Sequence, residues 1–237
     1  MIVNADDLGR SEAHNAAILR ALDEGLATSA SLMANMPSAV AAPGHVVGVH
    51  LNLTTGEPLS GAIPRFCDSD GRFVEWRRES GLFRVTREEG AAVAREWRAQ
   101  VERARELGVE VAHLDSHHHV HTEWPLGAIA IRLARECGIP RVRLARNCGA
   151  GLGVGNLSYK RVYNARLRRA GLAGTRYFGN VADWLHLKAG GATDAELRDF
   201  EVMVHPVLRD DGELVDDEAP EAPLAALVSP VAAATVL

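Results

Sequence analysis

The sequence predicts an α/β protein whose fold is an irregular (β/α) barrel, similar to a TIM barrel, with about seven parallel strands. Short apolar runs alternate with amphipathic helical segments along the chain, which favours parallel strands joined by crossover helices. No glycine-rich dinucleotide fingerprint is present, which favours a closed or nearly closed barrel over an open doubly wound sheet. The length of 237 residues suits one domain, so we expect residues 1–237 to form a single barrel.

The first elements follow from local patterns at the start of the chain. Residues 2–4 begin with Ile2 and Val3 and predict a short strand, after which Asp6 and Asp7 follow. A helix is expected from about Ser11, because apolar residues including Ile18 and Leu22 recur at helical spacing after it. Gly25 marks the end of this helix.

Two more strands and a long helix complete the first half. Residues 28–33 and 46–53 are short apolar runs and predict the second and third strands. Thr86 is followed three residues later by Glu89, which is the pattern of a capping box at a helix start. The helix that begins there is expected to run to Gly108.

The second half continues the same alternation of apolar runs and helical patterns. Its expected strands and helices, in chain order, are a strand at 109–114, a helix at 124–137, strands at 141–144 and 175–178 with a helix at 158–170 between them, a helix at 194–198 and a strand at 202–204.

Two segments depart from this alternation. Residues 55–85 form a long irregular stretch that contains Phe66, Phe73 and Trp76. A loop of this length inside a domain is often functional, and these aromatic rings could form one wall of a sugar site. Residues 218–237 are rich in Ala, Val and Pro, and we expect an atypical tail there.

Composition excludes several classes of partner. The net charge is −5, and the 26 Lys and Arg residues form no block that would indicate a nucleic-acid site. No apolar stretch approaches the roughly 18–20 residues that span a membrane, and no signal peptide is visible. The cysteines Cys67, Cys137 and Cys148 form no close pair, which favours a reducing compartment. We therefore expect a cytoplasmic protein without nucleic-acid or membrane partners, for which a homodimer is possible.

A cluster of histidines indicates a metal site. Five of the ten histidines fall within the run His113-Leu114-Asp115-Ser116-His117-His118-His119-Val120-His121, at the end of a predicted strand. Imidazole and carboxylate groups together are typical ligands of a divalent transition metal, and oxygen ligands also admit a harder ion. Two histidines and one carboxylate would leave positions open for water and substrate.

Other polar residues follow strands that should end on the same face. Asp6 and Asp7 come directly after the first strand, and His50 lies in the third. Adjacent acids can also simply cap a helix, but in a barrel the carboxyl ends of the strands converge at the catalytic face. His205 ends the last predicted strand, directly before Pro206, and would then lie on that face as well.

These segments carry a resemblance to a known family. The strings Asn4-Ala5-Asp6-Asp7-Leu8-Gly9, Gly48-Val49-His50-Leu51-Asn52-Leu53-Thr54, His113 to His121 and Glu201-Val202-Met203-Val204-His205-Pro206 resemble the motif set of the YdjC-type (ChbG-like) carbohydrate deacetylases. The resemblance implies an irregular (β/α) barrel that hydrolyses N-acetyl groups of amino sugars such as chitooligosaccharides. It also implies one divalent ion, Mg²⁺ or Zn²⁺, held by Asp7, His50 and His117.

The remaining site residues receive expected roles around that ion. Asp6 would take the proton of the attacking water, and the resemblance assigns protonation of the leaving amine to His205. The side chains expected to orient the ligands or contact the amino-sugar substrate are Asp115, His119, His121 and Arg143.

Three other functions stay open at this point. A metal-dependent phosphoester hydrolase would need a basic phosphate grip, for which Arg143 and Arg146 are the nearby residues. A glycosidase would use two carboxylates without a metal. A non-catalytic metal-binding or sensing module would bind the ion through the same ligands but would convert no substrate.

Overall fold

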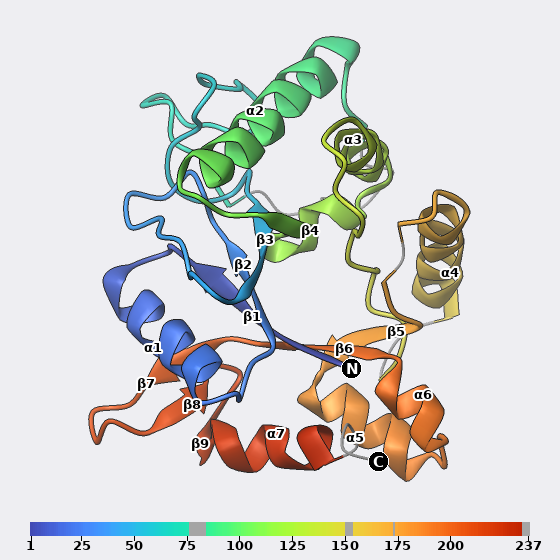
Figure 1. Ribbon diagram of the computed structural model, residues 1–237. Coiled ribbons are helices and arrows are strands. Elements are labelled where there is room, and N and C mark those ends of the chain that lie inside the picture. Colours follow the sequence, from blue (N-terminus) through green and yellow to red (C-terminus); the bar gives the residue numbers. More distant parts are fainter. Residues whose placement is uncertain (76–83, 150–153, 173, 234–237) are drawn as a thin grey trace.

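The centre of the protein is a curled parallel sheet of six strands (Figure 1). The computed structural model describes residues 1–75, 84–149, 154–172 and 174–233. The strands are ordered β4-β3-β2-β1-β6-β5 and every neighbouring pair is parallel. In chain order they are β1 (Ile2–Leu8), β2 (Ser29–Leu32), β3 (Val46–Leu51), β4 (Val111–Ser116), β5 (Tyr177–Asn180) and β6 (Phe200–Val204).

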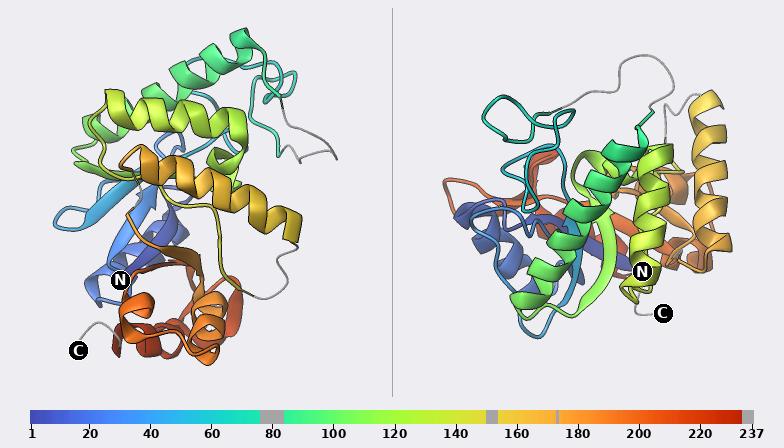
Figure 2. Two further views of the ribbon diagram at one scale, coloured as in Figure 1. Left: turned by 90° about the vertical axis from the view of Figure 1, so that its right-hand side faces the viewer. Right: turned by 90° about the horizontal axis from the view of Figure 1, so that it is seen from above.

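Helices lie around the outside of this sheet (Figure 1 and Figure 2). The predicted capping box of α2 is confirmed, since Thr86 Oγ1 accepts a hydrogen bond from Glu89 N and Glu89 Oε2 accepts one from Thr86 N. A short 3-10 helix, η1 (His117–Thr122), directly follows β4. The other helices around the sheet are α1 (Glu12–Asp23), α2 (Arg87–Glu106), α3 (Trp124–Glu136), α4 (Val154–Arg169), α5 (Val181–Ala189) and α6 (Asp194–Arg198).

One predicted strand is reduced to a single bridge. The segment 141–144 pairs with β4 only through Leu114 and Val142, so the sheet has six strands and not about seven. Beyond this bridge the backbone binds other partners: the side-chain amide of Asn164 exchanges two hydrogen bonds with the backbone of Ala145, at 2.8 and 2.9 Å. Because a side chain of α4 occupies these backbone groups, the segment between β4 and β5 does not continue as a strand.

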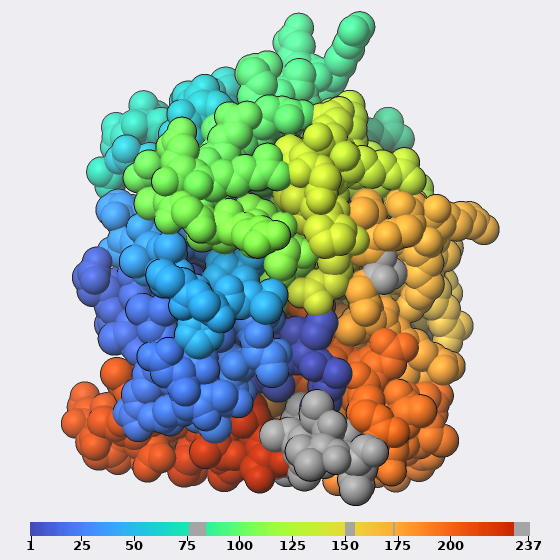
Figure 3. All heavy atoms as spheres, viewed as in Figure 1, coloured from blue at the N-terminus to red at the C-terminus, as the bar shows by residue number. Residues whose placement is uncertain are grey.

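The C-terminal part of the chain forms a second, smaller sheet beside α1. Strands β7 (Pro206–Leu208), β8 (Leu214–Asp216) and β9 (Ala219–Pro223) are antiparallel, and helix α7 (Leu224–Ala233) follows them. Figure 3 shows this red segment along the lower side of the molecule, beneath the blue N-terminal part. The segment expected to be an atypical tail thus contains a strand and a helix, although this strand lies outside the parallel sheet.

Two aromatic residues of the long loop after β3 pack in the hydrophobic core. Phe66 is fully buried and Phe73 nearly so, and both belong to the hydrophobic core. Neither lines a cavity at the polar centre, so the expectation that they form a wall of the sugar site is wrong for these two rings. Trp76, the third aromatic residue of that expectation, lies outside the described residues. Among the helices that are described, none is long and apolar enough to cross a membrane.

Candidate active site

Asp6 and Asp7 lie in an irregular part of β1. Asp7 has a φ of 71°, in the left-handed region that residues other than glycine rarely adopt. Neighbouring side chains of a regular strand point to opposite faces, yet both carboxylates lie near one imidazole. The Nε2 atom of His50 is 3.3 Å from Asp7 Oδ1 and 4.0 Å from Asp6 Oδ2. The irregular backbone therefore brings both acids to a single site, as strained backbone often does in functional sites.

Asp7, His50 and His117 form a group that could hold a metal ion. They come from β1, β3 and the start of η1, all three side chains are buried, and their candidate ligand atoms all lie within 4.8 Å of one another. Asp7 Oδ1 is 2.8 Å from His117 Nδ1. Two imidazoles and one carboxylate match the ligand set of catalytic zinc and related ions, so these residues fit a divalent cation.

A second group that could hold an ion consists of Asp6, His50 and Asp115. Its two acids already have a cationic partner, because the buried Arg143 binds both oxygens of Asp6, at 2.6 and 2.7 Å, and Asp115 Oδ2 at 2.7 Å. Among the described residues, the arginine that contacts Asp7 is the half-exposed Arg10, at 2.8 Å. The group with Asp7 therefore has more uncompensated negative charge, and we favour it as the ion site.

The charge around this site is strongly negative. Arg143 also donates through Nε to Glu201 Oε1 at 2.7 Å, so one buried guanidinium serves three carboxylates. Together with Asp7, the site has four buried carboxylates and one buried arginine. Buried charges that lack a partner are costly, so this arrangement favours a bound cation.

The pKa values of His50 and Asp7 reflect the charges of these neighbouring side chains. Burial works against a charged ring at His50, but the carboxylates of Asp115 and Asp6 outweigh it and raise the pKa of His50 to about 10. Burial alone would raise the pKa of Asp7, yet its hydrogen bonds with His117 and His50 hold it far below the usual range of a carboxyl. The site thus stabilises positive charge at the position of these rings.

Two of the predicted supporting residues orient other parts of the site. Asp115 Oδ1 lies 2.8 Å from His50 Nδ1, while its other oxygen accepts a 2.6 Å hydrogen bond from Ser31, so the His50 ring is held in place. His121 is buried and contacts Ser116 Oγ at 2.6 Å and the backbone oxygen of Arg143 at 3.1 Å. His121 therefore touches none of the three proposed metal ligands, and its contacts position Arg143 instead.

A cavity of about 280 Å³ opens beside the two acids. His205 lies at its edge with a quarter of its side chain exposed, and its Nδ1 atom is 3.8 Å from Glu218 Oε1. The β1–β6 pairing joins Ala5 to Val204, which places His205 next to Asp6. The residues that line the cavity are Asp6, Asp7, Arg10, His50, Ser116, His117, His118, His119, Met203, His205, Asp217 and Glu218.

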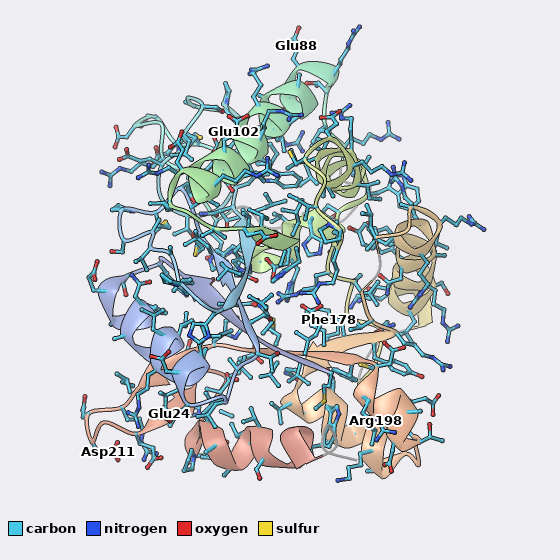
Figure 4. All side chains as sticks on the ribbon, viewed as in Figure 1. Glu24, Glu88, Glu102, Phe178, Arg198 and Asp211 are labelled. Carbon is cyan, nitrogen blue, oxygen red and sulfur yellow. The ribbon has the colours of Figure 1, made fainter. Side chains whose placement is uncertain are left out.

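A second cavity of about 270 Å³ adjoins the first and shares His119, Met203 and Glu218 with it. His119 is half-buried, its Nδ1 atom has no hydrogen-bond partner, and its ring meets the edge of Phe178. Figure 4 shows Phe178 in the interior beside β5. His119 thus lines both cavities, whereas the sequence left its role open between orienting a ligand and contacting the substrate.

Sequence reasoning gave no role to Glu201, Arg10 or Glu218. The alternation of strand side chains does contain a signal for Glu201, because residues 201, 203 and 205 of a strand share one face. Arg10 and Glu218 offered no comparable signal. Arg10 reaches Asp7 across a turn, and Glu218 reaches the cavity only because β8 and β9 fold back beside β6.

Gly48 explains how the buried His113 ring fits beneath the site. His113 Nε2 lies 3.1 Å from Ser31 Oγ, and burial lowers the pKa of His113 to about 3, so the ring is neutral. A Cβ atom on Gly48 would lie only 2.4 Å from this ring. The glycine in the Gly48-Val49-His50 string is thus required by close packing.

We expect Gly48→Ala to destabilise the protein. The added methyl group overlaps a fully buried ring, and overpacking of this kind costs roughly 1–3 kcal/mol of unfolding free energy. Denaturant unfolding monitored by circular dichroism measures the change. Gly90→Ala in α2 is the matched control, since its Cβ atom would meet nothing closer than 3.8 Å and alanine favours a helix. Equal stability of Gly48→Ala and the wild type would contradict the packing argument.

Comparison with known proteins gives three similar sequences. A "Carbohydrate deacetylase" of Brevibacillus brevis is 41% identical over 147 residues, which cover 59% of this chain and 57% of that protein. A protein of the same name from Oceanobacillus iheyensis is 36% identical over 58% of this chain and 62% of its own length. The matched part thus spans less than two thirds of these two relatives. A "Chitooligosaccharide deacetylase" of Klebsiella pneumoniae is 36% identical over 89% of this chain and 82% of that protein.

The fold and the family model agree with these similarities. A solved structure from Enterococcus faecalis V583, described as a "putative cellobiose-phosphate cleavage protein", superposes with a TM-score of 0.61 at 24% identity, over 89% of this chain and 82% of that one. At this identity the likeness concerns the fold alone. The family model described as "YdjC-like protein" matches residues 1–236. The chain therefore belongs to the YdjC-like protein family.

Proposed function

We propose that this protein is a metal-dependent hydrolase that removes the N-acetyl group from an amino sugar. The observation that carries the proposal is the buried group of Asp7, His50 and His117, with the carboxylate of Asp6 beside it. The names of the relatives from Brevibacillus brevis and Klebsiella pneumoniae support the reaction class. A divalent ion held by these three residues, magnesium or zinc, would supply Lewis-acid chemistry to the amide carbonyl and lower the pKa of a water molecule.

Asp6 acts as the general base in this proposal. Burial alone would raise its pKa, but the Arg143 guanidinium beside it holds the pKa below the usual range, so the carboxylate stays ionised. The two hydrogen bonds from Arg143 also fix its orientation. A lowered pKa weakens the base, while constant ionisation and fixed geometry favour proton transfer from a water near His50.

His205 acts as the general acid that protonates the leaving amine. It lies beside Asp6 across the β1–β6 pairing and reaches the cavity from the opposite strand. Its Nδ1 atom is 3.8 Å from Glu218 Oε1, so the ring lies beside a carboxylate at the edge of the cavity. The two proton-transfer groups thus come from adjacent strands, on opposite sides of the reacting bond.

The two adjoining cavities accommodate the substrate. The acetamido group occupies the first cavity, near Asp6, and the sugar extends into the second, where Phe178 and Met203 offer apolar faces to a pyranose ring. His119 lies between them, and its buried Nδ1 atom has no hydrogen-bond partner among the described residues. A chitooligosaccharide is consistent with this arrangement and with the name of the Klebsiella pneumoniae relative.

A mass-spectrometric screen of N-acetylated amino sugars tests the proposal. We expect loss of one acetyl group from at least one substrate, abolished by a chelator and restored by added metal. Turnover that survives complete metal removal would contradict the metal dependence and favour carboxylate-only chemistry. Cleavage of a glycosidic bond in place of the amide would contradict the reaction class.

The two arginines that the phosphoester alternative was expected to use are already engaged. Arg143 is engaged by the carboxylates of Asp6, Asp115 and Glu201, and Arg146 donates to Asp183 at 2.6 Å. Neither guanidinium is free to bind a phosphate at the metal site, so we favour amide hydrolysis. The single domain over residues 1–237, the cytoplasmic location and the homodimer stay predictions.

A further inference from the structure

A third, larger cavity lies away from the proposed active site. It measures about 860 Å³, is open to solvent, and shares no lining residue with either cavity at the metal site. It lies between α4 and the start of β5. Its lining residues are Asn147, Arg161, Asn164, Arg168, Gly174, Thr175, Arg176, Tyr177 and Asp199.

Helix α4 supplies one wall of this cavity. Arg161, Asn164 and Arg168 stand at positions i, i+3 and i+7, which share one face of a helix. Asn164 fixes the rotation of α4, because its side chain exchanges two hydrogen bonds with the backbone of Ala145. The two arginines on either side of Asn164 are therefore directed into the cavity. Arg176 contributes a third guanidinium from the opposite wall.

The positive charge of this cavity is poorly compensated. Within the parts of the chain that the structure describes, Arg161 has no hydrogen-bond or ion-pair partner, and Arg168 donates only to the backbone oxygen of Arg176. Arg176 is itself 57% exposed and lies 3.5 Å from a Glu196 oxygen. Asp199, the acidic residue in the lining, accepts a hydrogen bond from the backbone of Arg176.

This concentration of charge contrasts with the chain as a whole. The net charge of the protein is −5, yet Val154–Arg169 contains five Lys and Arg side chains and no Asp or Glu. Like charges that converge on a concave surface repel one another and raise the local potential for anions. Guanidinium groups bind phosphate through paired hydrogen bonds, so three of them around one cavity match an oxyanion with several oxygens.

We propose that this arginine cavity, lined by Arg161, Arg168 and Arg176, is a binding site for phosphate, either free or as the phosphomonoester of a small molecule. The site is separate from the proposed deacetylation chemistry and does not depend on it. Its ligand is recognised by charge and by the fork geometry of the guanidinium groups. The cavity volume of about 860 Å³ leaves room for an organic part beside the phosphate.

Isothermal titration of the full chain tests the site with inorganic phosphate, glycerol 3-phosphate and, as the uncharged control, glycerol. We expect saturable binding of the phosphates and none of glycerol. The double variant Arg161→Gln/Arg168→Gln should weaken binding roughly tenfold or more, as expected when charge-assisted hydrogen bonds are removed. Tighter binding of glycerol 3-phosphate than of phosphate would assign the site to organic phosphates, and the reverse order to the free ion.

A matched variant distinguishes phosphate binding in the arginine cavity from a general effect of the protein's positive charge. Arg72→Gln/Arg103→Gln removes the same charge from side chains that are 65% and 47% exposed and paired with surface glutamates. We expect this variant to bind phosphate as the wild type does. Absence of saturable binding in the wild type overturns the proposal. Binding that survives in Arg161→Gln/Arg168→Gln, for instance at the metal site, or that falls equally in both double variants, also overturns it.

Discussion

Replacement of His50 by alanine should remove bound metal and turnover together. His50 contributes one of three proposed ligands, and its ring is fixed by Asp115 at 2.8 Å, so no nearby side chain can replace it. The same joint loss is expected for Asp7→Ala and His117→Ala. With two ligands left, the site binds a divalent ion weakly, and activity should fall below detection at metal concentrations that saturate the wild type.

Elemental analysis beside a deacetylation assay measures this prediction. His45→Ala is the matched control, because His45 lies at the surface, paired with Asp23, and lines neither active-site cavity. It should retain both metal and activity. Full metal occupancy in all three variants would show that the ion binds elsewhere, whereas full occupancy in the Asp7 and His117 variants with loss in the His50 variant would indicate the group of Asp6, His50 and Asp115.

Asp6→Asn should separate metal binding from proton transfer. The amide cannot take a proton from water, so kcat is expected to fall by roughly 10²–10⁴ while metal content stays at the wild-type level. The structure adds a second effect, since Arg143 loses one of its three carboxylates and would face an amide N–H or a neutral oxygen. We therefore also expect a lower free energy of unfolding.

Single-turnover kinetics, metal content and denaturant unfolding measured together test this variant. Asp23→Asn is a suitable control, because Asp23 is 72% exposed and bonds only to His45. Near-wild-type kcat in Asp6→Asn would remove Asp6 from the mechanism. Loss of metal in the same variant would mean that the two adjacent acids have exchanged roles.

The parts of the fold that the sequence predicted are those with local signals. The capping box of Thr86 and Glu89 involves residues three positions apart, so the start of α2 can be predicted from the local sequence pattern. Strand positions followed from apolar runs in the same way. By contrast, 141–144 alternates Arg with Val and Leu as a strand can, yet it pairs with β4 through one bridge, and the bonds of the distant Asn164 to Ala145 have no local pattern.

The candidate site likewise contains residues that sequence patterns could predict and contacts that they could not. The ends of parallel strands converge in any barrel of this kind, so Asp7, His50 and His117 could be expected to meet. The contacts of Arg143 could not be predicted, because they join it to Asp6 across 137 positions and to Glu201 across 58. The positive φ of Asp7 likewise depends on packing around it, for which no local pattern exists.

The central position of β1 has a consequence for folding during synthesis. The register pairs Ile2 with Glu201, so one edge of β1, the first strand to be synthesised, stays unpaired until β6, the last strand of the parallel sheet, is made. Asp7, His50 and His117 all leave the ribosome long before Glu201 and His205 do. The nascent chain can therefore bring its proposed ion ligands together while one edge of β1 is still unpaired and available for pairing with other chains. Early capture of a metal ion on the ribosome would stabilise this half-built sheet until β6 arrives.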